Sequence, residues 1–308
     1  MADPYAVPTR IAVTGAGGNL GRKLIAHLVA EASWCEEIVA LDRDDAALEA
    51  LNGLADDRAI PIRRVAADLT DARGDWRGAL ASVDAVVHFA AQNPYPGASW
   101  DDACLSFDMT ANLLSAAAET GVRRVVFASS NHVMGRYKDP PLADEIGPGR
   151  LTTALTPGPG TRWTVRGEPI DGVAYAASKL MGERACLAAA AASGGALTAV
   201  AIRIGWCQPG ENLARTLNTT GVPGAEDGPP EPPSRELTWF RAMWLSNRDF
   251  AHLLTRALVA DPAGWPAPGI VVNGMSANTG MAWDIAETSR LLGYKAQDDV
   301  ERALREGG

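Results

Sequence analysis

Residues 10–21 read RIAVTGAGGNLG, a short apolar run that ends in a glycine-rich turn. The run from Ile11 to Val13 is typical of a parallel strand that is buried on both faces. Apolar residues at helical spacing from Leu24 to Val29 predict a helix after the turn. A strand, a glycine-rich turn and a helix in this order form a site where free N–H groups of the helix bind a diphosphate.

The residues of this turn have separable tasks in such a site. Gly15 permits the tight turn, Gly18 lets the backbone approach the diphosphate, and Gly21 lets the helix lie close to the sheet. Asn19 and Leu20, in the same turn, are further candidates to bind the cofactor, and the helix that follows offers its positive dipole end and free N–H groups to the diphosphate. An ordinary strand-to-helix turn also uses glycine, but the acidic residue that follows favours dinucleotide binding.

That acidic residue is Asp42, which follows a second apolar run about 20 residues after the turn. A carboxylate at this place accepts hydrogen bonds from the ribose hydroxyls and repels a 2′-phosphate, which favours NAD over NADP. The next residue, Arg43, has two interpretations. It could stack on adenine or meet a 2′-phosphate of the cofactor, or it could be a solvated surface charge. The predicted cofactor is therefore NAD.

Residues suited to a bound cofactor also stand where the later predicted strands end. Asp68 and Leu69 follow the third strand, where a carboxylate and a backbone N–H can contact adenine, although Asp68 could equally be a simple cap. Mostly small residues end the fourth and fifth strands, namely Phe89, Ala90, Ala91 and Ala128. Small side chains let a cofactor lie against a strand, and close helix packing is the alternative reason for them.

Strand and helix patterns alternate through the first two thirds of the chain, which predicts an α/β fold with a doubly wound parallel (Rossmann) sheet. We expect residues 1–205 to form an NAD-binding domain that carries the catalytic residues. Residues 206–308 are expected to form mainly a small substrate-binding lobe and lid, with a late strand and a last helix at 283–292 packing partly on the core. The Pro- and Gly-rich segments 139–171 and 209–234 are predicted to be loops.

The composition limits the partners that the chain can have. The net charge is −9 and no basic run is longer than Arg-Arg, so nucleic acid and anionic membranes are not expected partners. The four cysteines show no paired or metal-ligand spacing, which predicts a cytoplasmic protein without a metal. Neither a signal peptide nor a transmembrane run is expected, and a homo-oligomer is left open.

Tyr175 and Lys179 lie one helical turn apart in a strongly predicted helix. A phenol with its ordinary pKa of about 10 is a poor base at neutral pH, and a neighbouring ammonium group lowers that pKa. Lys179 can also bind the nicotinamide ribose, and a serine at the end of the fifth strand, Ser129 or Ser130, can donate to the reacting oxygen. By itself, a tyrosine and a lysine four residues apart on a helix are often only structural. In a chain that also carries a dinucleotide-binding turn, the same spacing favours a catalytic pair.

In these features the chain resembles the extended short-chain dehydrogenase/reductase family, also called the NAD-dependent epimerase/dehydratase family. The matching pieces occur in the family's order: Thr14-Gly15-x-x-Gly18-x-x-Gly21, Asp42, Asp68-Leu69, Phe89-Ala90-Ala91, Ser129-Ser130 and Tyr175-x-x-x-Lys179. The resemblance implies that Tyr175 is the general acid/base, Lys179 its partner and Ser130 the polarising hydroxyl. Ser106 stands where many members have an asparagine, so their water-bridged support of the lysine is not implied.

Within that family the chain is most similar to the uronate dehydrogenases. The similar segments are 127–132 (FASSNH) with Gly135, Arg203-Ile204-Gly205-x-Cys207 and Ser276-Ala277-Asn278. The resemblance implies oxidation of the anomeric C1 hydroxyl of a hexuronic acid to a lactone with NAD. It also implies that Asn131, His132 and Asn93 contact the sugar, that Arg235 pairs with its negative group, and that Cys207 lies at the cofactor. His132 as a structural residue and Arg235 as a surface charge are the alternatives.

Other substrates and activities remain open from the sequence. Trp206 is bulkier than the residue expected there, and a related aldose or sugar-phosphate dehydrogenase would use Arg235, Arg241 or Arg248 toward a phosphate. A nucleotide-sugar epimerase or dehydratase with tightly bound NAD is the alternative enzyme class. That class needs a larger C-terminal lobe, whereas only about a hundred residues follow the sixth strand. A dinucleotide sensor without catalysis would not need Ser130, Tyr175 and Lys179 together.

Overall fold

The central sheet of the computed structural model has seven strands in the order β3-β2-β1-β4-β5-β8-β9, and every neighbouring pair is parallel. The structure describes residues 6–54, 60–95, 97–165, 167–218 and 234–307. The strands are β1 (Arg10–Thr14), β2 (Glu37–Asp42), β3 (Ile62–Ala66), β4 (Ala85–His88), β5 (Arg124–Ser130), β8 (Thr198–Ile204) and β9 (Gly269–Gly274). The predicted doubly wound parallel sheet is confirmed.

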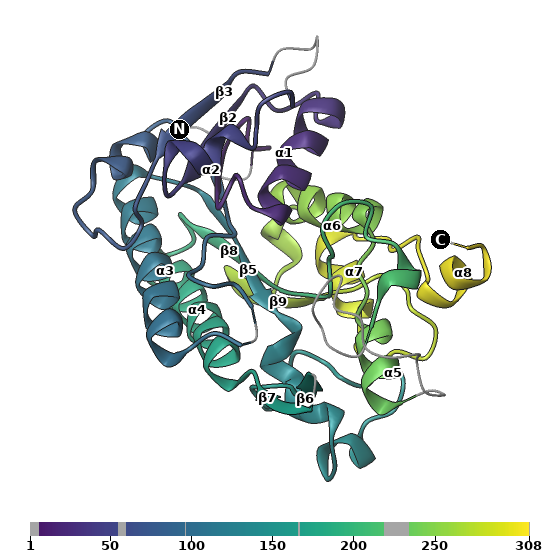
Figure 1. The fold of residues 1–308 in the computed structure, drawn as a ribbon. Coiled ribbons are helices and arrows are strands. Elements are labelled where there is room, and N and C mark those ends of the chain that lie inside the picture. The colour runs from purple at the N-terminus through teal and green to yellow at the C-terminus, as the bar shows by residue number, and fades with distance from the viewer. Residues whose placement is uncertain (1–5, 55–59, 96, 166, 219–233, 308) are drawn as a thin grey trace.

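Helices cover both faces of this sheet (Figure 1). One face carries α1 (Asn19–Glu31), α6 (Asn247–Val259) and α7 (Ala286–Leu292), and the other carries α3 (Trp100–Thr120), α4 (Val173–Ala192) and the 3₁₀ helix η1 (Asp75–Leu80). Alternation along β1 explains the two layers, because Ile11 and Val13 pack in one core and Ala12 packs in the other. The shorter helices are α2 (Asp45–Glu49), α5 (Arg235–Ala242) and α8 (Val300–Arg305).

The strand order reverses between β1 and β4, which places a crevice at their carboxyl ends. The Ala90 N–H donates to Thr14 Oγ1 at 3.3 Å, so the chain after β4 lies directly beside the chain after β1. His88, at the end of β4, hydrogen-bonds Thr14 Oγ1 through Nδ1 at 2.7 Å and Thr110 Oγ1 on α3 through Nε2 at 3.1 Å. These contacts fix the floor of the crevice.

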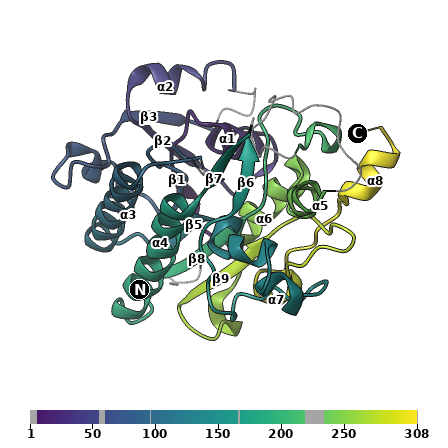
Figure 2. The same ribbon diagram turned by 60° about the horizontal axis from the view of Figure 1, so that its bottom comes forward.

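A β-hairpin occupies part of the segment that the sequence predicted only as a loop. Its strands β6 (Arg162–Val165) and β7 (Glu168–Asp171) pair in antiparallel register, and Gly167 has a φ of +84° in the connecting turn. The glycine and the β-propensity of Trp163, Thr164 and Val165 are the signal that the sequence analysis missed. Figure 2 shows β6 beside α5, and a ring contact between Trp163 and Phe240 joins the two.

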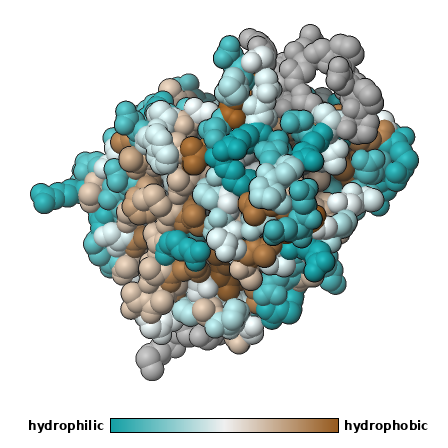
Figure 3. Space-filling model, turned by 90° about the horizontal axis from the view of Figure 1, so that it is seen from below, coloured by the Kyte–Doolittle hydropathy of each residue, from teal (hydrophilic) through white to brown (hydrophobic). Residues whose placement is uncertain are grey.

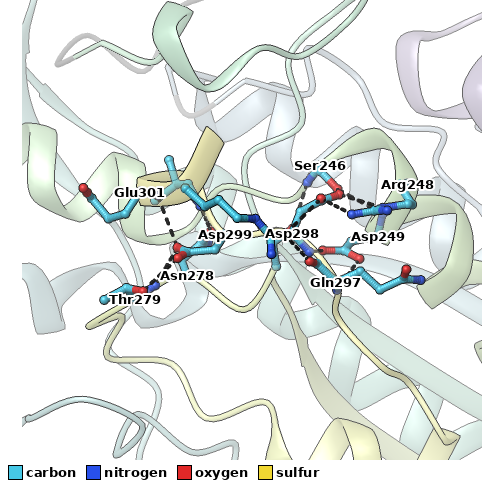
Figure 4. A network of polar contacts seen from close by, with 12 residues as sticks. Ser246, Arg248, Asp249, Asn278, Thr279, Gln297, Asp298, Asp299 and Glu301 are labelled. Atoms are coloured by element: carbon cyan, nitrogen blue, oxygen red, sulfur yellow. Dashed lines mark hydrogen bonds and ion pairs between the residues drawn. The ribbon is translucent and has the colours of Figure 1, made fainter. Parts of the chain in front are cut away.

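The C-terminal segment is held to α6 by a network of polar contacts (Figure 4). The Asp249 carboxylate is fully buried and accepts from the N–H groups of Gln297 at 2.8 Å and Asp298 at 3.0 Å. Asn278 donates to the carbonyls of Ala242 and Trp244 and accepts from the Val300 N–H, so it ties the end of α5 to α8. The presence of α8 also corrects one prediction: the helix expected at 283–292, which corresponds to α7, is not the last helix of the chain.

The outer surface of α3 and α4 exposes several apolar side chains. Trp100 on α3 and Met181 on α4 are large and exposed, whereas the exposed Leu105 of α3 faces the crevice. The face seen in Figure 3 also shows brown and tan side chains gathered at the left, where Figures 1 and 2 place these helices. A homo-oligomer would cover such a surface, and it stays a prediction. No helix within the described ranges has both the length and the apolar character to cross a membrane.

Candidate active site

A cleft of about 750 Å³ runs along the carboxyl ends of the strands. Most residues predicted for the site line it: Gly15, Gly18, Asn19, Leu20, Gly21, Asp42, Arg43, Asp68, Leu69, Phe89, Ala90, Ala91, Ala128, Ser130, Asn131, His132, Tyr175, Lys179 and Cys207. Asn93 and Arg235 do not line it. We call the part formed after β1, β2, β3 and β4 the cofactor half, and the part around Tyr175, Trp163, Trp206 and Phe240 the substrate half.

The glycine turn of the cofactor half leaves room for a diphosphate. Gly15 has a φ of +66°, and a Cβ there would lie 2.9 Å from the Ala90 nitrogen. A Cβ at Gly21 would lie 2.3 Å from the Gly15 carbonyl oxygen, so only glycine lets α1 begin this close to the turn. Gly18 is the N-cap of α1, and no side chain in the described part of the molecule caps that end. The N–H groups of the first turn therefore remain for phosphate oxygens, which fits NAD.

Asp42 is held at the end of β2 by two backbone donors. Its carboxylate accepts from the N–H groups of Gly17 and Arg43, both at 2.8 Å. The sequence analysis did not single out Gly17. The structure shows why glycine stands there, because a Cβ would lie 2.0 Å from the Ala47 carbonyl oxygen. The guanidinium of Arg43 is exposed and pairs with Asp44 at 3.2 Å. The carboxylate thus has a fixed position from which to accept from ribose hydroxyls.

Asp68 makes a local turn at the end of β3. Its Oδ1 accepts from the Thr70 hydroxyl at 2.6 Å and from the Thr70 N–H at 2.9 Å. These hydrogen bonds lower the pKa of the Asp68 carboxyl below its ordinary value. Asp68 therefore caps a turn, as the second interpretation expected, and it also lines the cofactor half, where its contact with adenine stays a prediction.

Ser130, Tyr175 and Lys179 come together where the two halves meet. The Ser130 hydroxyl lies beside the Tyr175 phenol, close enough to lower its pKa, and accepts from the His132 N–H at 3.2 Å. Lys179 Nζ donates to the Ala128 carbonyl at 2.8 Å and lies 5.8 Å from the centroid of the Tyr175 ring. A phenol, a hydroxyl and an ammonium group at one point in a cleft can bind and move the proton of a substrate hydroxyl.

The expected effect of Lys179 on Tyr175 is corrected by the structure. Burial raises the pKa of Tyr175 above its ordinary value, and the neighbouring Ser130 side chain opposes this rise only partly. Burial also lowers the pKa of Lys179 to about 8. The reason is that the lysine ammonium group is bound to a strand carbonyl rather than to the phenol oxygen, so desolvation dominates at Tyr175.

Glu183 continues the same face of α4 one turn beyond Lys179 and forms a buried ion pair. Its carboxylate accepts from Arg203 Nε and Nη2, both at 2.9 Å, and from the Ser129 hydroxyl at 2.6 Å. Both charged side chains are almost fully buried. Ser129 and Arg203 are register partners on β5 and β8, so this contact fixes α4 against the two strands beside Ser130.

Ser106 takes part in the site in a way the sequence did not predict. Its hydroxyl accepts from the Gln92 N–H at 3.0 Å and donates to the Gln92 carbonyl at 3.2 Å. Gln92 in turn lines the cleft after β4. Because Lys179 binds the Ala128 carbonyl directly, Ser106 fixes the chain after β4 instead of supporting the lysine.

Aromatic rings form the wall of the substrate half. Successive ring centroids lie 5.8 Å apart for Tyr175 and His132, 6.0 Å for His132 and Trp163, 6.1 Å for Trp163 and Phe240, and 5.6 Å for Phe240 and Trp206. All five residues line the cleft, and we call them the aromatic wall. They come from η2 (Asn131–Lys138), β6, α4, α5 and the chain after β8.

Asn131 and His132 are buried at the base of this wall. His132 Nδ1 hydrogen-bonds Thr161 Oγ1 at 2.7 Å, and burial lowers the His132 pKa to about 4, so the ring is neutral at pH 7. Asn131 Nδ2 donates to the Ile204 carbonyl at 3.0 Å, while Oδ1 has no partner among the residues that the structure describes. The two residues are thus placed to offer uncharged hydrogen-bonding groups.

Asn93 and Arg235 lie outside the cleft for identifiable reasons. Asn93 donates to Asp102 Oδ2 at 3.2 Å and so faces the start of α3. Arg235 begins α5 and lies about 140° around the helix from Phe240, the α5 residue that lines the cleft. Arg248 pairs with Asp298, as Figure 4 shows. The predicted lid at 209–234 falls mostly on residues 219–233, which lie outside the described residues.

Comparisons with known proteins agree with this geometry. The chain is 29% identical to the NAD-dependent glucose-6-phosphate dehydrogenase of Haloferax volcanii, with 96% of each chain covered. It is 31% identical to the L-arabinose 1-dehydrogenase (NAD(P)(+)) of the same organism, over 94% of this chain and 97% of the relative. A solved structure described as a mutated uronate dehydrogenase is similar with a TM-score of 0.64 and 28% identity, over 97% of this chain and 85% of the other.

The family model described as "NAD dependent epimerase/dehydratase family" matches residues 11–206. This range begins in β1 and includes the glycine turn, Asp42, Ser130, Tyr175 and Lys179. The expected cofactor, NAD, is thereby confirmed at the level of the family, as is the resemblance drawn from the sequence. The chain belongs to the NAD-dependent epimerase/dehydratase family.

Proposed function

We propose that this chain is an NAD-dependent dehydrogenase that oxidises a carbinol of a sugar, giving a lactone when the carbinol is the anomeric C1. The observation that carries the proposal is the meeting of Ser130, Tyr175 and Lys179 at the junction of the two halves of the cleft. The similarity over nearly the whole chain to sugar dehydrogenases supports it.

When bound, NAD supplies the acceptor for the hydride that leaves the carbinol carbon. Tyr175 takes the hydroxyl proton of the substrate on its phenol oxygen, and Ser130 donates a hydrogen bond to the carbinol oxygen. Because burial raises the pKa of Tyr175, the phenol oxygen is held protonated in this structure. A positive charge brought next to it, from Lys179 or from the ligand side, is what lowers that pKa for proton uptake.

The remaining site residues hold the cofactor in this proposal. The first turn of α1 with Gly15, Gly18, Asn19, Leu20 and Gly21 binds the diphosphate, and Asp42 binds the adenosine ribose. Leu69, Phe89, Ala90, Ala91, Ala128 and Cys207 form its apolar surroundings, together with Arg43 and Asp68 at the adenosine end. We also propose the division into residues 1–205 for the cofactor and 206–308 mainly for the substrate, and a cytoplasmic location.

The test is to incubate the purified protein with added NAD and a panel of aldoses, uronic acids, sugar phosphates and nucleotide-sugars. We expect stoichiometric NADH and an oxidised sugar from at least one of the simple sugars. An isomerised or dehydrated nucleotide-sugar without NADH would instead identify an epimerase or dehydratase. No reaction of any sugar would overturn the proposed function.

A further inference from the structure

The charged residues that line the cleft are distributed unevenly. Asp42, Arg43 and Asp68 lie at the far end of the cofactor half, after β2 and β3. In the substrate half, Lys179 is the one cationic side chain among the described lining residues, and its Nζ is bound to the Ala128 carbonyl. An anionic group of a substrate would therefore find no free cation on this wall.

Arginines in the neighbourhood of the substrate half are engaged elsewhere. Arg136 and Arg162 both pair with Asp171, with contacts at 2.8 Å and 3.4 Å. Arg203 is bound by the buried Glu183 carboxylate. Arg235 and Arg241, on α5, do not line the cleft. These cations are thus committed to the fold or lie outside the substrate half.

The aromatic wall offers the surface that an uncharged sugar ring needs. The C–H face of a pyranose is apolar, and an aromatic ring presents a negative face to such hydrogens. Trp206 and Phe240 lie with centroids 5.6 Å apart and both line the cleft. Their planes meet at 65°, so they form an angled apolar corner of indole and phenyl where the sequence led us to expect a small residue at position 206.

Uncharged polar groups accompany these rings. Asn131 is 4% exposed and Trp163 is 6% exposed, and both line the cleft. The Asn131 Oδ1 acceptor and the Trp163 Nε1 donor are buried without a hydrogen-bond partner among the described residues. A buried donor or acceptor is costly when it is left unpaired, so a substrate hydroxyl that reaches it stabilises the complex.

Resting on the proposed function, we infer that the substrate half selects a neutral aldose and rejects uronic acids and sugar phosphates. Hydroxyl groups satisfy the amide and indole groups, and the ring stacks on the aromatic wall. A carboxylate or phosphate loses its hydration against indole and phenyl rings and gains no cation in return. Arg235, the predicted partner of a substrate anion, has no role in this assignment.

The main test needs only the wild-type protein with NAD and matched sugars. The pairs are D-galactose with D-galacturonate, and D-glucose with D-glucuronate and glucose 6-phosphate, each measured as kcat/KM for NADH formation. We expect the neutral member of at least one set to be preferred by about 100-fold or more, the size of effect that a missing charge partner produces. Equal values, or a preference for the anionic member, would overturn the inference and leave the proposed function intact.

Three variants locate the cause of the preference. Trp206→Arg places a cation on the half-buried part of the wall, and we expect it to raise the anionic-to-neutral ratio of kcat/KM by about 10-fold or more. Trp206→Phe, which keeps a ring, is the matched variant and should leave the ratio within about two-fold. Arg235→Ala should leave the wild-type values unchanged, whereas a selective loss on anionic sugars would overturn the inference.

Arg166 lies outside the described residues, so its variant provides an independent check. If Arg166→Ala selectively lowers kcat/KM for an anionic sugar that the wild type prefers, that arginine is the anion site and the inference is wrong. An unchanged preference for the neutral sugar supports it. If NADH forms with none of the sugars of the wider panel, the proposed function itself fails. If NADH forms but an anionic sugar is preferred, only this inference fails, so the two failures can be told apart.

Discussion

The two halves of the cleft are built in different ways. The cofactor half consists of residues that directly follow β1, β2, β3 and β4, and it offers mainly backbone N–H groups and small side chains. The substrate half consists of large side chains from β6, α4, α5 and the chain after β8. The first kind of site is encoded in short motifs, and the second arises only when distant segments pack together.

This difference also separates the tasks of binding and chemistry. The diphosphate and ribose contacts of the cofactor half do not involve the Tyr175 phenol, which lies at the junction with the substrate half. A change confined to one half should therefore leave the function of the other half nearly intact. The following variants test this independence, beginning with the largest expected effect.

Tyr175→Phe should lower kcat by about 1,000-fold or more, because it removes the oxygen that accepts the substrate proton. The Kd for NAD, measured by fluorescence titration, should stay within about three-fold, since the diphosphate and adenosine contacts lie elsewhere. Tyr137→Phe is the matched control, because its hydroxyl donates to the Thr156 carbonyl at 2.9 Å outside the cleft. A Tyr175→Phe protein with wild-type turnover would contradict the mechanism.

Glu183→Gln tests the support that lies beneath both halves. It leaves Arg203 as a buried cation without a carboxylate, which typically costs 3–5 kcal/mol in the free energy of unfolding. Urea denaturation measures this loss directly. Glutamine keeps one acceptor oxygen for Ser129 but turns an amide donor toward the second Arg203 donor, so we also expect α4 to shift beside the catalytic Ser130 and kcat to fall.

The double variant Glu183→Leu with Arg203→Met is the comparison for this change. Replacing both charges by apolar groups of similar size is often neutral for stability, so it should be more stable than Glu183→Gln. If kcat stays low in the double variant, the ion pair positions the catalytic helix as well as stabilising it. A Glu183→Gln protein with both wild-type stability and wild-type kcat would show that the pair does neither.

Sequence reasoning placed residues in the cleft correctly where they stand at a strand end. Gly15, Asp42 and Ser130 line the cleft because parallel strands bring their carboxyl ends to one edge. The same reasoning failed for Arg235, since the phase of α5 decides which of its residues faces the cleft, and that phase is set by packing. Trp163 was missed for a related reason: its hairpin lies in a Pro- and Gly-rich segment without a clear period.

Two buried histidines, His132 in the substrate half and His88 beneath the floor of the crevice, should make stability depend on pH. Burial lowers the pKa of His132 to about 4 and that of His88 to about 3. The unfolded chain takes up these protons near pH 6.5, so the stabilisation is complete above that pH and is lost as the pH falls. Each histidine should contribute a slope of about 1.4 kcal/mol per pH unit below pH 6.5.

Denaturation at pH 7, 6 and 5 measures this slope in the free energy of unfolding. His132→Gln should reduce the slope by about 1.4 kcal/mol per pH unit, while His88 and the partly buried His27 and His252, whose pKa values burial also lowers, still contribute. A free energy of unfolding that is constant from pH 7 to pH 5 would show that neither ring is held neutral by burial.

The smallest expected effect concerns cofactor choice in the cofactor half. Asp42→Ala removes the ribose acceptor and the charge that repels a 2′-phosphate, while the exposed Arg43 remains beside it. We expect the NADP-to-NAD ratio of kcat/KM to rise by about 10-fold, equivalent to 1.4 kcal/mol.

Asp42→Asn keeps the shape and an acceptor for one of the two backbone N–H groups, so it separates the charge from the support of the Gly17 turn. Asp45→Ala, an exposed aspartate at the start of α2, is the matched control and should leave the ratio unchanged. Because none of these residues touches the substrate half, the preference among sugars should not move in any of the three variants. A shift in sugar preference would show that the two halves are coupled, and an unchanged NADP-to-NAD ratio would show that Asp42 does not face the ribose.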